Sequence, residues 1–246
     1  PLYSSAASDV YKRQDMVAYN EAAELAERGF LTSSCCPAFV SYIRKSFPEL
    51  QENISHNMSP MATIAKRIKE KDPEAKTVFI GPCTAKKGEF QLPEVHKYVD
   101  CVLTFEELQA MFDSRELDVA GMEETVLNNA SGYGRIFAHC GGLAAAAAEA
   151  LKEQGIDFEL KPLSCNGIEE CKLALMKAAR GKLDANFVEG MACVGGCVNG
   201  AGCMTHNERN RVKVDAHSQQ AQLKSITDSL LYAAEIDREL KEKAGD

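Results

Sequence analysis

The sequence has 246 residues, contains no tryptophan, and has little of what marks a membrane or nucleic-acid-binding protein. Its longest unbroken apolar run, from Leu143 to Ala148, is far shorter than the roughly 20 residues that cross a bilayer. No charged start leads into an apolar segment, so we expect no signal peptide and a cytoplasmic location. Acidic residues outnumber basic ones by 36 to 28, and the net charge of −8 disfavours binding to nucleic acid. We therefore expect no nucleic-acid partner and no membrane insertion.

An initiator methionine is also absent, and residues 1–14 are small and polar without helical or strand periodicity. We interpret this run as a non-native leader. Residues 15–217 are then expected to form one domain that is incomplete at its N-terminus. Residues 218–246 are expected to form a C-terminal helix that packs on this domain.

The remaining composition is typical of a globular α/β protein, with 45% hydrophobic and 26% charged residues. Helical patterns alternate with short apolar strands, which predicts mainly parallel sheets flanked by helices, in one large domain or two intimate lobes. Two helix starts are well marked: Ser59 before Pro60, and Thr104 with Glu107 three residues later. The predicted helices are residues 15–28, 38–47, 59–71, 104–112, 143–155, 167–180 and 218–243. The predicted strands are residues 77–80 (short and buried), 101–103, 158–163 and 185–188.

Ten cysteines are the most unusual feature. A chain of this size can bury its own core without disulfides, so we expect a reducing compartment in which some thiols act as ligands or catalysts. We interpret a first group as small buried hydrophobic residues: Cys101, Cys140, Cys165 and Cys171. A second group lies in loops beside glycine or proline, each after a predicted helix or strand: Cys35, Cys36, Cys83, Cys193 and Cys197.

Loops at one end of parallel strands converge, so this second group of cysteines is expected to meet at one site. Four thiolates of this kind suit an iron–sulfur cluster or a zinc ion. Zinc sites usually show paired C-x₂₋₄-C knuckles, whereas this chain has one adjacent pair, one single cysteine and one C-x₃-C pair. The spacing therefore favours an iron–sulfur cluster.

Three segments resemble, in order, the three signature motifs of the FeFe hydrogenases. Ser33 to Pro37 (SSCCP) is similar to the first motif, and Pro82 to Lys87 (PCTAKK), followed by Glu89, is similar to the second. The third motif, E-x-M-A-C-x-x-G-C, is matched from Glu189 to Cys197. The resemblance covers about residues 15–205. It implies two intimate lobes with the cofactor site in the cleft between them.

The resemblance implies an H-cluster, which is a 4Fe–4S cluster joined to a di-iron subcluster that carries CO, cyanide and azadithiolate. Its expected 4Fe–4S ligands are Cys36, Cys83, Cys193 and Cys197, with Cys197 also bridging to the di-iron unit. Lys86 is expected to donate a charge-assisted hydrogen bond to cyanide. Pro82, Phe137 and Met191 are expected to contact the cofactor.

The implied reaction is 2H⁺ + 2e⁻ ⇌ H₂, with ferredoxin or another redox domain or subunit as electron partner and dedicated maturation enzymes. By resemblance Cys35 stays free of iron and donates a proton, which a thiol can do because its environment can shift its pKa. The proton path is then expected to continue through Glu21, Ser55 and Glu24. Glu21 and Glu24 are three residues apart and so share one helix face.

Several positions depart from the family's usual pattern, namely Gly81, Met61, Phe39 and the segment from Gly200 to Cys203. Such changes around a metal site shift its potential or catalytic bias, which leaves a sensory member of the family as an alternative. A non-catalytic, hydrogenase-like iron–sulfur assembly protein is a second alternative. Cys203 is a candidate for a further ligand or redox thiol. The sequence shows neither the family's A-P-x-x-R-like segment nor the C-x₂-C-x₂-C-x₃-C runs of accessory clusters.

Overall fold

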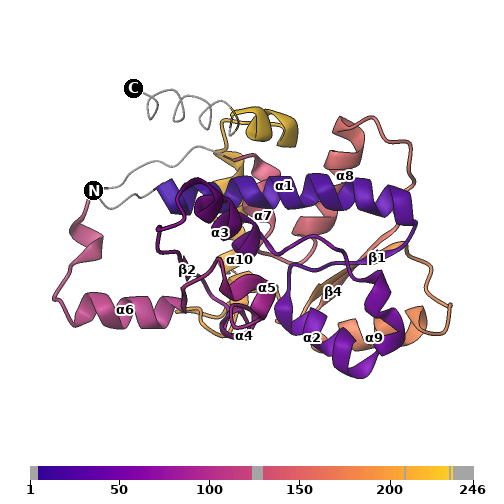
Figure 1. Cartoon of the computed structure of the whole chain (residues 1–246), viewed down its shortest axis with the longest axis horizontal. Coiled ribbons are helices and arrows are strands. Elements are labelled where there is room, and N and C mark those ends of the chain that lie inside the picture. Colours follow the sequence, from indigo (N-terminus) through magenta and orange to yellow (C-terminus); the bar gives the residue numbers. More distant parts are fainter. Residues whose placement is uncertain (1–4, 124–129, 208, 233, 235–246) are drawn as a thin grey trace.

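Two parallel sheets organise the computed structural model, which describes residues 5–123, 130–207, 209–232 and 234 (Figure 1). The larger sheet has the strand order β1-β5-β4, and the smaller sheet pairs β2 with β3. The strands are β1 (Leu31–Thr32), β2 (Val78–Ile80), β3 (Cys101–Leu103), β4 (Pro162–Asn166) and β5 (Phe187–Met191). Every pair is parallel, so the α/β architecture with parallel sheets and flanking helices is confirmed.

The helices lie between and around these strands. Those before β3 are α1 (Ser5–Arg28), α2 (Pro37–Ser46), η1 (Pro48–Asn53), α3 (Pro60–Lys71), α4 (Lys86–Glu89) and α5 (Pro93–His96). Those after β3 are α6 (Phe105–Asp113), η2 (Val119–Gly121), α7 (Gly132–Ile136), α8 (Gly142–Glu153), α9 (Ile168–Ala178), η3 (Cys197–Asn199) and α10 (Arg209–Gln219). The long helix α1 runs along the long axis of the molecule and packs on both α3 and α8 (Figure 1). It therefore joins the helices of the two sheets.

The larger sheet is covered on both faces. All residues of β5 are buried, as expected for the central strand of a parallel sheet. Phe187 packs in a core cluster with residues of α1 and α8, and Val188 packs in a second cluster with residues of α2 and α9. Neighbouring side chains of a strand point to opposite faces of the sheet, so these two clusters cover the two faces of β5. The loop that follows β5 therefore begins between the two helix layers.

The smaller sheet is covered on one face only within the described residues. Phe79 packs against the cluster that α3 and β3 build with Met61 and Val102. Its neighbours Val78 and Ile80 are 48% and 43% exposed. The prediction of a buried strand at residues 77–80 is therefore right in position and wrong in burial.

The two well-marked helix starts are confirmed. The hydroxyl of Ser59 accepts a hydrogen bond from the backbone of Ala62, and proline stands at the first turn of α3. Thr104 and Glu107 make a reciprocal capping box at α6. In both helices a side chain satisfies a backbone donor that has no partner within the helix.

Other boundaries differ from the sequence-based expectation. Helix α1 begins at Ser5, so residues 5–14 are helical although their sequence shows no periodicity. The strand expected at 158–163 lies at 162–166. Strand β1, which pairs with β5, falls outside the predicted helices and strands. Pairing with a strand far along the chain, and not local propensity, forms this short element.

The single C-terminal helix expected at residues 218–243 is also wrong within the described part. Helix α10 ends at Gln219, and helical structure resumes at 226–232. The carboxylate of Glu153 accepts hydrogen bonds from the backbones of Ile226 and Thr227 at 2.8 and 2.7 Å, and Ile226 is fully buried against the α1–α8 cluster. This contact fixes a new helix start in place of a continued α10. The remainder of that prediction, residues 235–246, lies outside the described residues.

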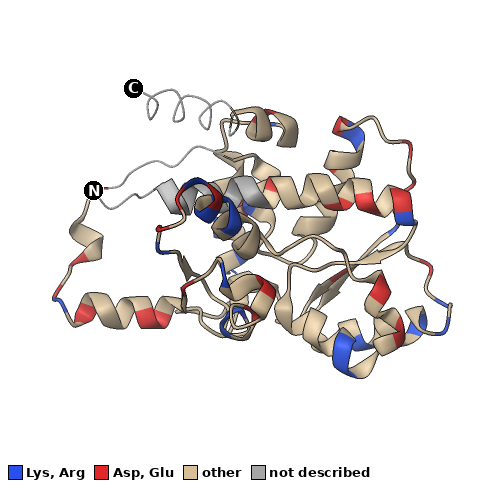
Figure 2. Cartoon of the chain, viewed as in Figure 1, with Lys and Arg blue, Asp and Glu red and all other residues tan. Residues whose placement is uncertain are grey.

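Charged residues of both signs are distributed over the helices and loops (Figure 2). Helix α6 carries acidic residues only, whereas α2 carries basic residues in its last turn. Among the helices described here, none combines the length and the apolar character that a bilayer crossing needs.

Candidate functional site

The second group of cysteines follows the strands of both sheets. Cys36 is the N-cap residue of α2, shortly after β1, and Cys83 lies between β2 and α4. Cys193 follows β5, and Cys197 begins η3. Each therefore lies beyond the carboxyl end of a parallel strand, the edge at which α/β proteins bind ligands.

One cavity of about 980 Å³ collects these loops from the two sheets. It is lined by all five cysteines of the second group, and by Pro82, Lys86, Phe137 and Met191. The thiols are near enough to influence one another electrostatically. Burial, and then the negative charge of Cys36 and Cys83, raises the pKa of Cys197 to about 12.

The donor set of this cavity fits an iron–sulfur cluster. Cys36, Cys83, Cys193 and Cys197 line it together, and four soft sulfur donors match the Cys₄ ligation of such a cluster. The N-terminus of α2 at Cys36, and the backbone N–H groups of Ala85 and Lys86 directed at the Cys83 sulfur, would offset negative charge there.

A tight turn brings Cys197 into this cavity. Gly196 adopts a φ of +86°, a conformation that side chains of L-residues rarely take. A Cβ atom built there would lie 2.8 Å from the backbone nitrogen of Cys140. The glycine of the third motif is therefore required by the close approach of two backbones.

Lys86 is buried, with 7% of its surface exposed, and its charge is paired. Its Nζ lies 2.6 Å from Oε2 of Glu89 and 3.5 Å from the backbone oxygen of Cys35. Burial alone would lower the pKa of Lys86, but Glu89 more than compensates, and the pKa is raised. A permanent cation therefore stands beside Cys35, and Glu89 is a residue that the sequence-based assignment of Lys86 missed.

Cys35 lines the cavity, and Glu21 is near enough to influence its thiol electrostatically. Glu21 is completely buried, and neither carboxylate oxygen makes a well-formed hydrogen bond within the described residues. Burial raises the pKa of Glu21 to about 8, with only partial compensation by the nearby Ser55 hydroxyl. Burial and the charge of Glu21 also raise the pKa of Cys35 well above its usual range.

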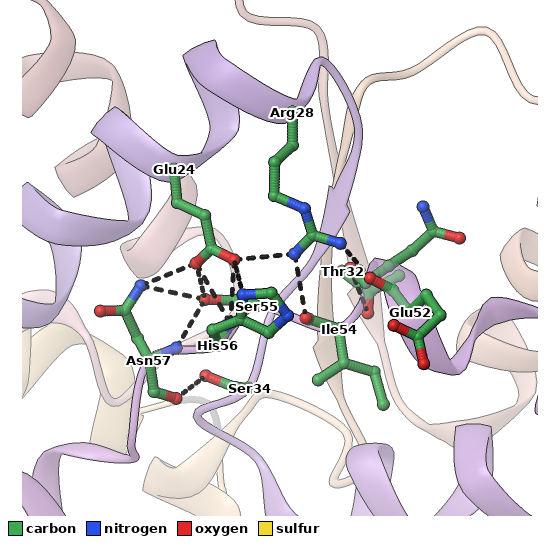
Figure 3. A network of polar contacts seen from close by, with 10 residues as sticks. Glu24, Arg28, Thr32, Ser34, Glu52, Ile54, Ser55, His56 and Asn57 are labelled. Carbon is green, nitrogen blue, oxygen red and sulfur yellow. Dashed lines mark hydrogen bonds and ion pairs between the residues drawn. The ribbon is translucent and has the colours of Figure 1, made fainter.

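A network of polar contacts surrounds Glu24, the second glutamate on this face of α1 (Figure 3). Ser55 donates to Glu24 at 2.9 Å, and so does the side-chain amide of Asn57. Arg28 donates to the same carboxylate at 2.8 Å and also to the backbone oxygen of Glu52. The backbone N–H of His56 donates to both Glu24 oxygens at 3.0 and 3.2 Å.

This network keeps Glu24 ionised. Burial opposes ionisation, but the donors from His56, Arg28 and Ser55 more than offset it, and the pKa of Glu24 is lowered. Ser55 thus donates to Glu24 and lies near Glu21, whose carboxylate oxygens make no well-formed hydrogen bond among the described residues. The sequence had not indicated Arg28, His56 and Asn57, because their role depends on contact between α1 and the loop after η1.

Glu189, the first residue of the third motif, stabilises the fold beside the cavity through hydrogen bonds. Its carboxylate accepts hydrogen bonds from the backbones of Gly141, Leu143 and Ala144, and from the Ser164 hydroxyl at 2.9 Å. It thereby caps the N-terminus of α8 and ties that helix to β4 and β5. Glu189 also lines the cysteine cavity.

Cys203 lines the same cavity and is 7% exposed. Its thiol donates to the backbone oxygens of Val198 at 3.3 Å and Cys197 at 3.5 Å. These bonds hold the loop after η3. The structure thus shows Cys203 bonded to the backbone of this loop, and it does not place Cys203 in a set of metal ligands.

The comparisons with known proteins agree with the three cysteine motifs. The family described as the C-terminal domain of the iron-only hydrogenase large subunit matches residues 4–201. Iron hydrogenase 1 of Clostridium pasteurianum is 29% identical over 91% of this chain and 46% of its own length. The large subunit of the periplasmic Fe hydrogenase of Nitratidesulfovibrio vulgaris is 30% identical over 76% of this chain and 56% of its own. The chain spans about half the length of these curated relatives.

Other matches cover different kinds of protein and the fold itself. A cytosolic Fe–S cluster assembly factor, NAR1 of Kluyveromyces lactis, is 38% identical over 37% of this chain and 19% of its own. A variant of the FeFe hydrogenase HydA1 from Chlamydomonas reinhardtii superposes with a TM-score of 0.63 at 20% identity, covering 89% of this chain and 74% of that one. At that identity the superposition shows a shared fold, and the relatives include both hydrogenases and assembly factors.

Proposed function

Because this chain belongs to the family of the C-terminal domain of iron-only hydrogenase large subunits, we propose that it is the catalytic domain of an FeFe hydrogenase. In this proposal it interconverts protons and H₂ with electrons from a low-potential carrier. The observation that carries the proposal is the meeting of five cysteines and Lys86 in one cavity, from which Glu21, Ser55 and Glu24 lead outward. A metal store or a scaffold has no evident need for such a path.

In the proposed site Cys36, Cys83, Cys193 and Cys197 hold a 4Fe–4S cluster, and the cavity holds the di-iron subcluster with its CO, cyanide and azadithiolate ligands. That cofactor supplies the H–H chemistry. Lys86 anchors its anionic ligands from a buried position where its charge is little screened. Pro82, Phe137 and Met191 close the cavity, and apolar walls of this kind exclude water and strengthen nearby charges.

Protons reach the cavity along the chain's own residues. Cys35 holds a proton at Sγ because its raised pKa keeps the thiol neutral. Glu21 holds the next exchangeable proton, since its pKa of about 8 keeps this carboxyl mostly protonated near neutral pH. Ser55 connects Glu21 to Glu24, because its hydroxyl can donate one hydrogen bond while its oxygen accepts another.

Ferredoxin, or another redox domain or subunit, supplies electrons, and maturation enzymes deliver the di-iron subcluster. The ten unpaired cysteines suit a reducing compartment, so we assign the protein to the cytoplasm. Residues 15–217 form the hydrogenase-like domain in this proposal, and Ile226 packs on its core.

The test is anaerobic maturation of the full chain, followed by infrared spectroscopy and an H₂ assay with a low-potential reductant. CO and cyanide bands together with H₂ evolution support the catalytic proposal. Bands with little turnover contradict it and favour a sensory protein, which the changes at Gly81 and Met61 would suit. Absence of the bands after verified maturation contradicts it in favour of an assembly protein, an alternative that the match to NAR1 supports.

A further inference from the structure

The outer network around Glu24 contains a group that the path of Glu21, Ser55 and Glu24 does not use. The imidazole Nδ1 of His56 lies 3.3 Å from Oε1 of Glu24, while its side chain is 74% exposed. His56 thus touches the carboxylate with one ring nitrogen and leaves the rest of the ring in solvent (Figure 3). Its backbone N–H bonds the same carboxylate, which fixes the residue at this position.

His56 also stands where the path meets solvent. Ser55, His56 and Asn57 line a second cavity of about 1100 Å³. It adjoins the cavity of the cysteines, with which it shares Pro37, Ala38, Thr84 and Ala85. Glu21 is fully buried and lines neither cavity. The other charged side chains that line this second cavity are Arg44, Lys45, Glu52, Glu89 and Glu94. His56 therefore lies on the solvent side of Glu24, at the second cavity.

Glu24 by itself is a poor collector of protons. It accepts hydrogen bonds from Arg28, Ser55, Asn57 and the backbone of His56, and these donors stabilise the ionised form. A carboxylate of this kind holds very little exchangeable proton near neutral pH. Imidazole is the side chain whose ordinary titration range lies between pH 5 and 8, so it can carry a proton where a carboxylate does not.

We propose that His56 is the proton-exchange group of this chain, passing protons between solvent and the Glu24 end of the path. The inference rests on the proposed function and deepens it. In the inward direction the Nδ1–H bond of protonated His56 breaks and the proton bonds to Oε1 of Glu24. The neutral imidazole takes its next proton from water or buffer, and no electron moves in this step. Glu24 passes its proton to Ser55, which releases its own proton toward Glu21.

The arrangement also assigns a positioning role to Asn57. Its side-chain amide donates to Oε2 of Glu24 at 2.9 Å and to the hydroxyl of Ser55 at 3.1 Å. Oε2 is thereby held toward Ser55, while Oε1 is left for Arg28 and His56. The two carboxylate oxygens thus face opposite directions of proton transfer.

The first test uses the full chain without cofactor. The pKa of Glu24 is measured by NMR of a ¹³C-labelled carboxyl in the native chain, in His56→Gln and in the control His96→Gln. His96 is exposed on α5 beside Phe90, and no described contact joins it to Glu24. The charge of His56 contributes to the lowered pKa of Glu24, so we expect the pKa to rise in His56→Gln only. An equal pKa of Glu24 in all three proteins would show that His56 does not act on Glu24 and would overturn the inference. This result does not depend on what the protein catalyses.

The second test uses the matured protein in dilute, non-penetrating buffer. We expect His56→Gln to slow H₂ evolution roughly 3- to 10-fold at pH 8, less than the 10²–10⁴-fold typical of a group at the reacting atoms, because solvent partly replaces it. The ratio of the native rate to the rate of His56→Gln should shrink as pH falls, since hydronium then protonates Glu24 directly. Added imidazole should restore the rate of His56→Gln and leave His96→Gln unchanged.

A rate of His56→Gln equal to the native rate at every pH, or one that imidazole does not restore, would overturn the inference. A matured native chain that evolves no H₂ contradicts the proposed function instead. The two failures are distinguishable because the Glu24 measurement needs neither cofactor nor turnover.

Discussion

Two carboxylates on α1, Glu21 and Glu24, lie one helical turn apart and have opposite environments. Glu21 is completely buried without a well-formed hydrogen bond in the described residues, and its pKa is raised to about 8. Glu24 accepts hydrogen bonds from several donors, and its pKa is lowered. The same residue type on the same helix face therefore holds a proton at one position and a negative charge at the next.

This difference between the two pKa values follows from the surroundings of each side chain. Glu21 faces the interior, where desolvation penalises charge. Glu24 faces the loop after η1, whose backbone and side chains supply donors. A path that ends on a neutral acid inside and on an anion outside favours proton storage near the cysteine cavity and proton exchange at the surface. Changes at each position should therefore have different consequences.

The largest effect is expected at the inner end, from Cys35→Ala. Removing the thiol removes the last donor before the cavity, and H₂ evolution should fall about 10²–10⁴-fold, as for other groups that transfer protons at a reacting centre. Cluster content should stay unchanged, because Cys35 is not among the proposed ligands. The check is H₂ evolution per iron–sulfur cluster, with Cys101→Ala on β3 as a control. Full activity in Cys35→Ala would show that Cys35 does not transfer protons in this protein.

Glu21→Gln should separate activity from stability. A neutral amide cannot relay a proton, so we expect H₂ evolution to fall by roughly 10². Fold stability near pH 7 should be unaffected or higher, since glutamine has the shape of the protonated carboxyl that the folded chain already prefers. The check is the rate together with the urea midpoint. A large loss of stability would contradict the neutral, buried state of Glu21.

The pH dependence of stability sharpens the same point. The folded pKa of Glu21, about 8, exceeds the ordinary value of 4.5, so the folded chain binds this proton more tightly than the unfolded chain does. The resulting stabilisation is complete below pH 4.5 and is lost as pH rises toward 8. Urea unfolding between about pH 5 and 8 should show this decline in the native chain and a flatter profile in Glu21→Gln. An identical decline in both proteins would assign it to other groups.

A smaller effect is expected at the outer end, from Glu24→Gln. The amide keeps an acceptor but loses the charge that Arg28 and His56 face, so stability should fall by about 1 kcal/mol at neutral pH. The contribution of a lowered carboxyl pKa is present above its unfolded value and lost as pH falls, so the difference from the native chain should vanish in acid. H₂ evolution should fall about 10-fold, less than for Glu21→Gln, because solvent can reach Ser55 from the second cavity. A larger loss of H₂ evolution in Glu24→Gln than in Glu21→Gln would contradict the expected order of the two effects.

The smallest effect is expected from Asn57→Ala. The variant loses the hydrogen bonds to Glu24 and Ser55, which should cost about 1 kcal/mol in stability and slow H₂ evolution about threefold. A matched control is Asn53→Ala, in the last turn of η1, where the described side-chain network does not include this amide. Equal rates in Asn57→Ala and in the control would show that the orientation of Glu24 does not depend on Asn57.

Much of the fold could be predicted from local sequence, and the contacts that complete the site could not. The caps at Ser59 and Thr104 use residues within three positions of each other, so the sequence contains the whole interaction. Strand β1 is two residues long and exists through its pairing with β5, more than 150 positions away in the chain. No local pattern could have revealed it.

The candidate site shows the same division. Motif spacing indicated the cysteines and Lys86, and the structure places them in one cavity. The pairing of Lys86 with Glu89, and the contacts of Arg28, His56 and Asn57 with Glu24, depend on how α4 and the loop after η1 fold against their neighbours. Their residue types are common on protein surfaces, so only geometry distinguishes them.

The most direct test of the central claim compares two adjacent cysteines. The full chain is reconstituted anaerobically with iron and sulfide, and cluster content is measured by Mössbauer and EPR spectroscopy in the native protein, Cys36→Ser and Cys35→Ser. We predict one 4Fe–4S cluster per chain in the native protein and in Cys35→Ser, and its loss in Cys36→Ser. Loss of the cluster in Cys35→Ser with retention in Cys36→Ser, or no cluster in any of the three, would contradict the proposed ligand set.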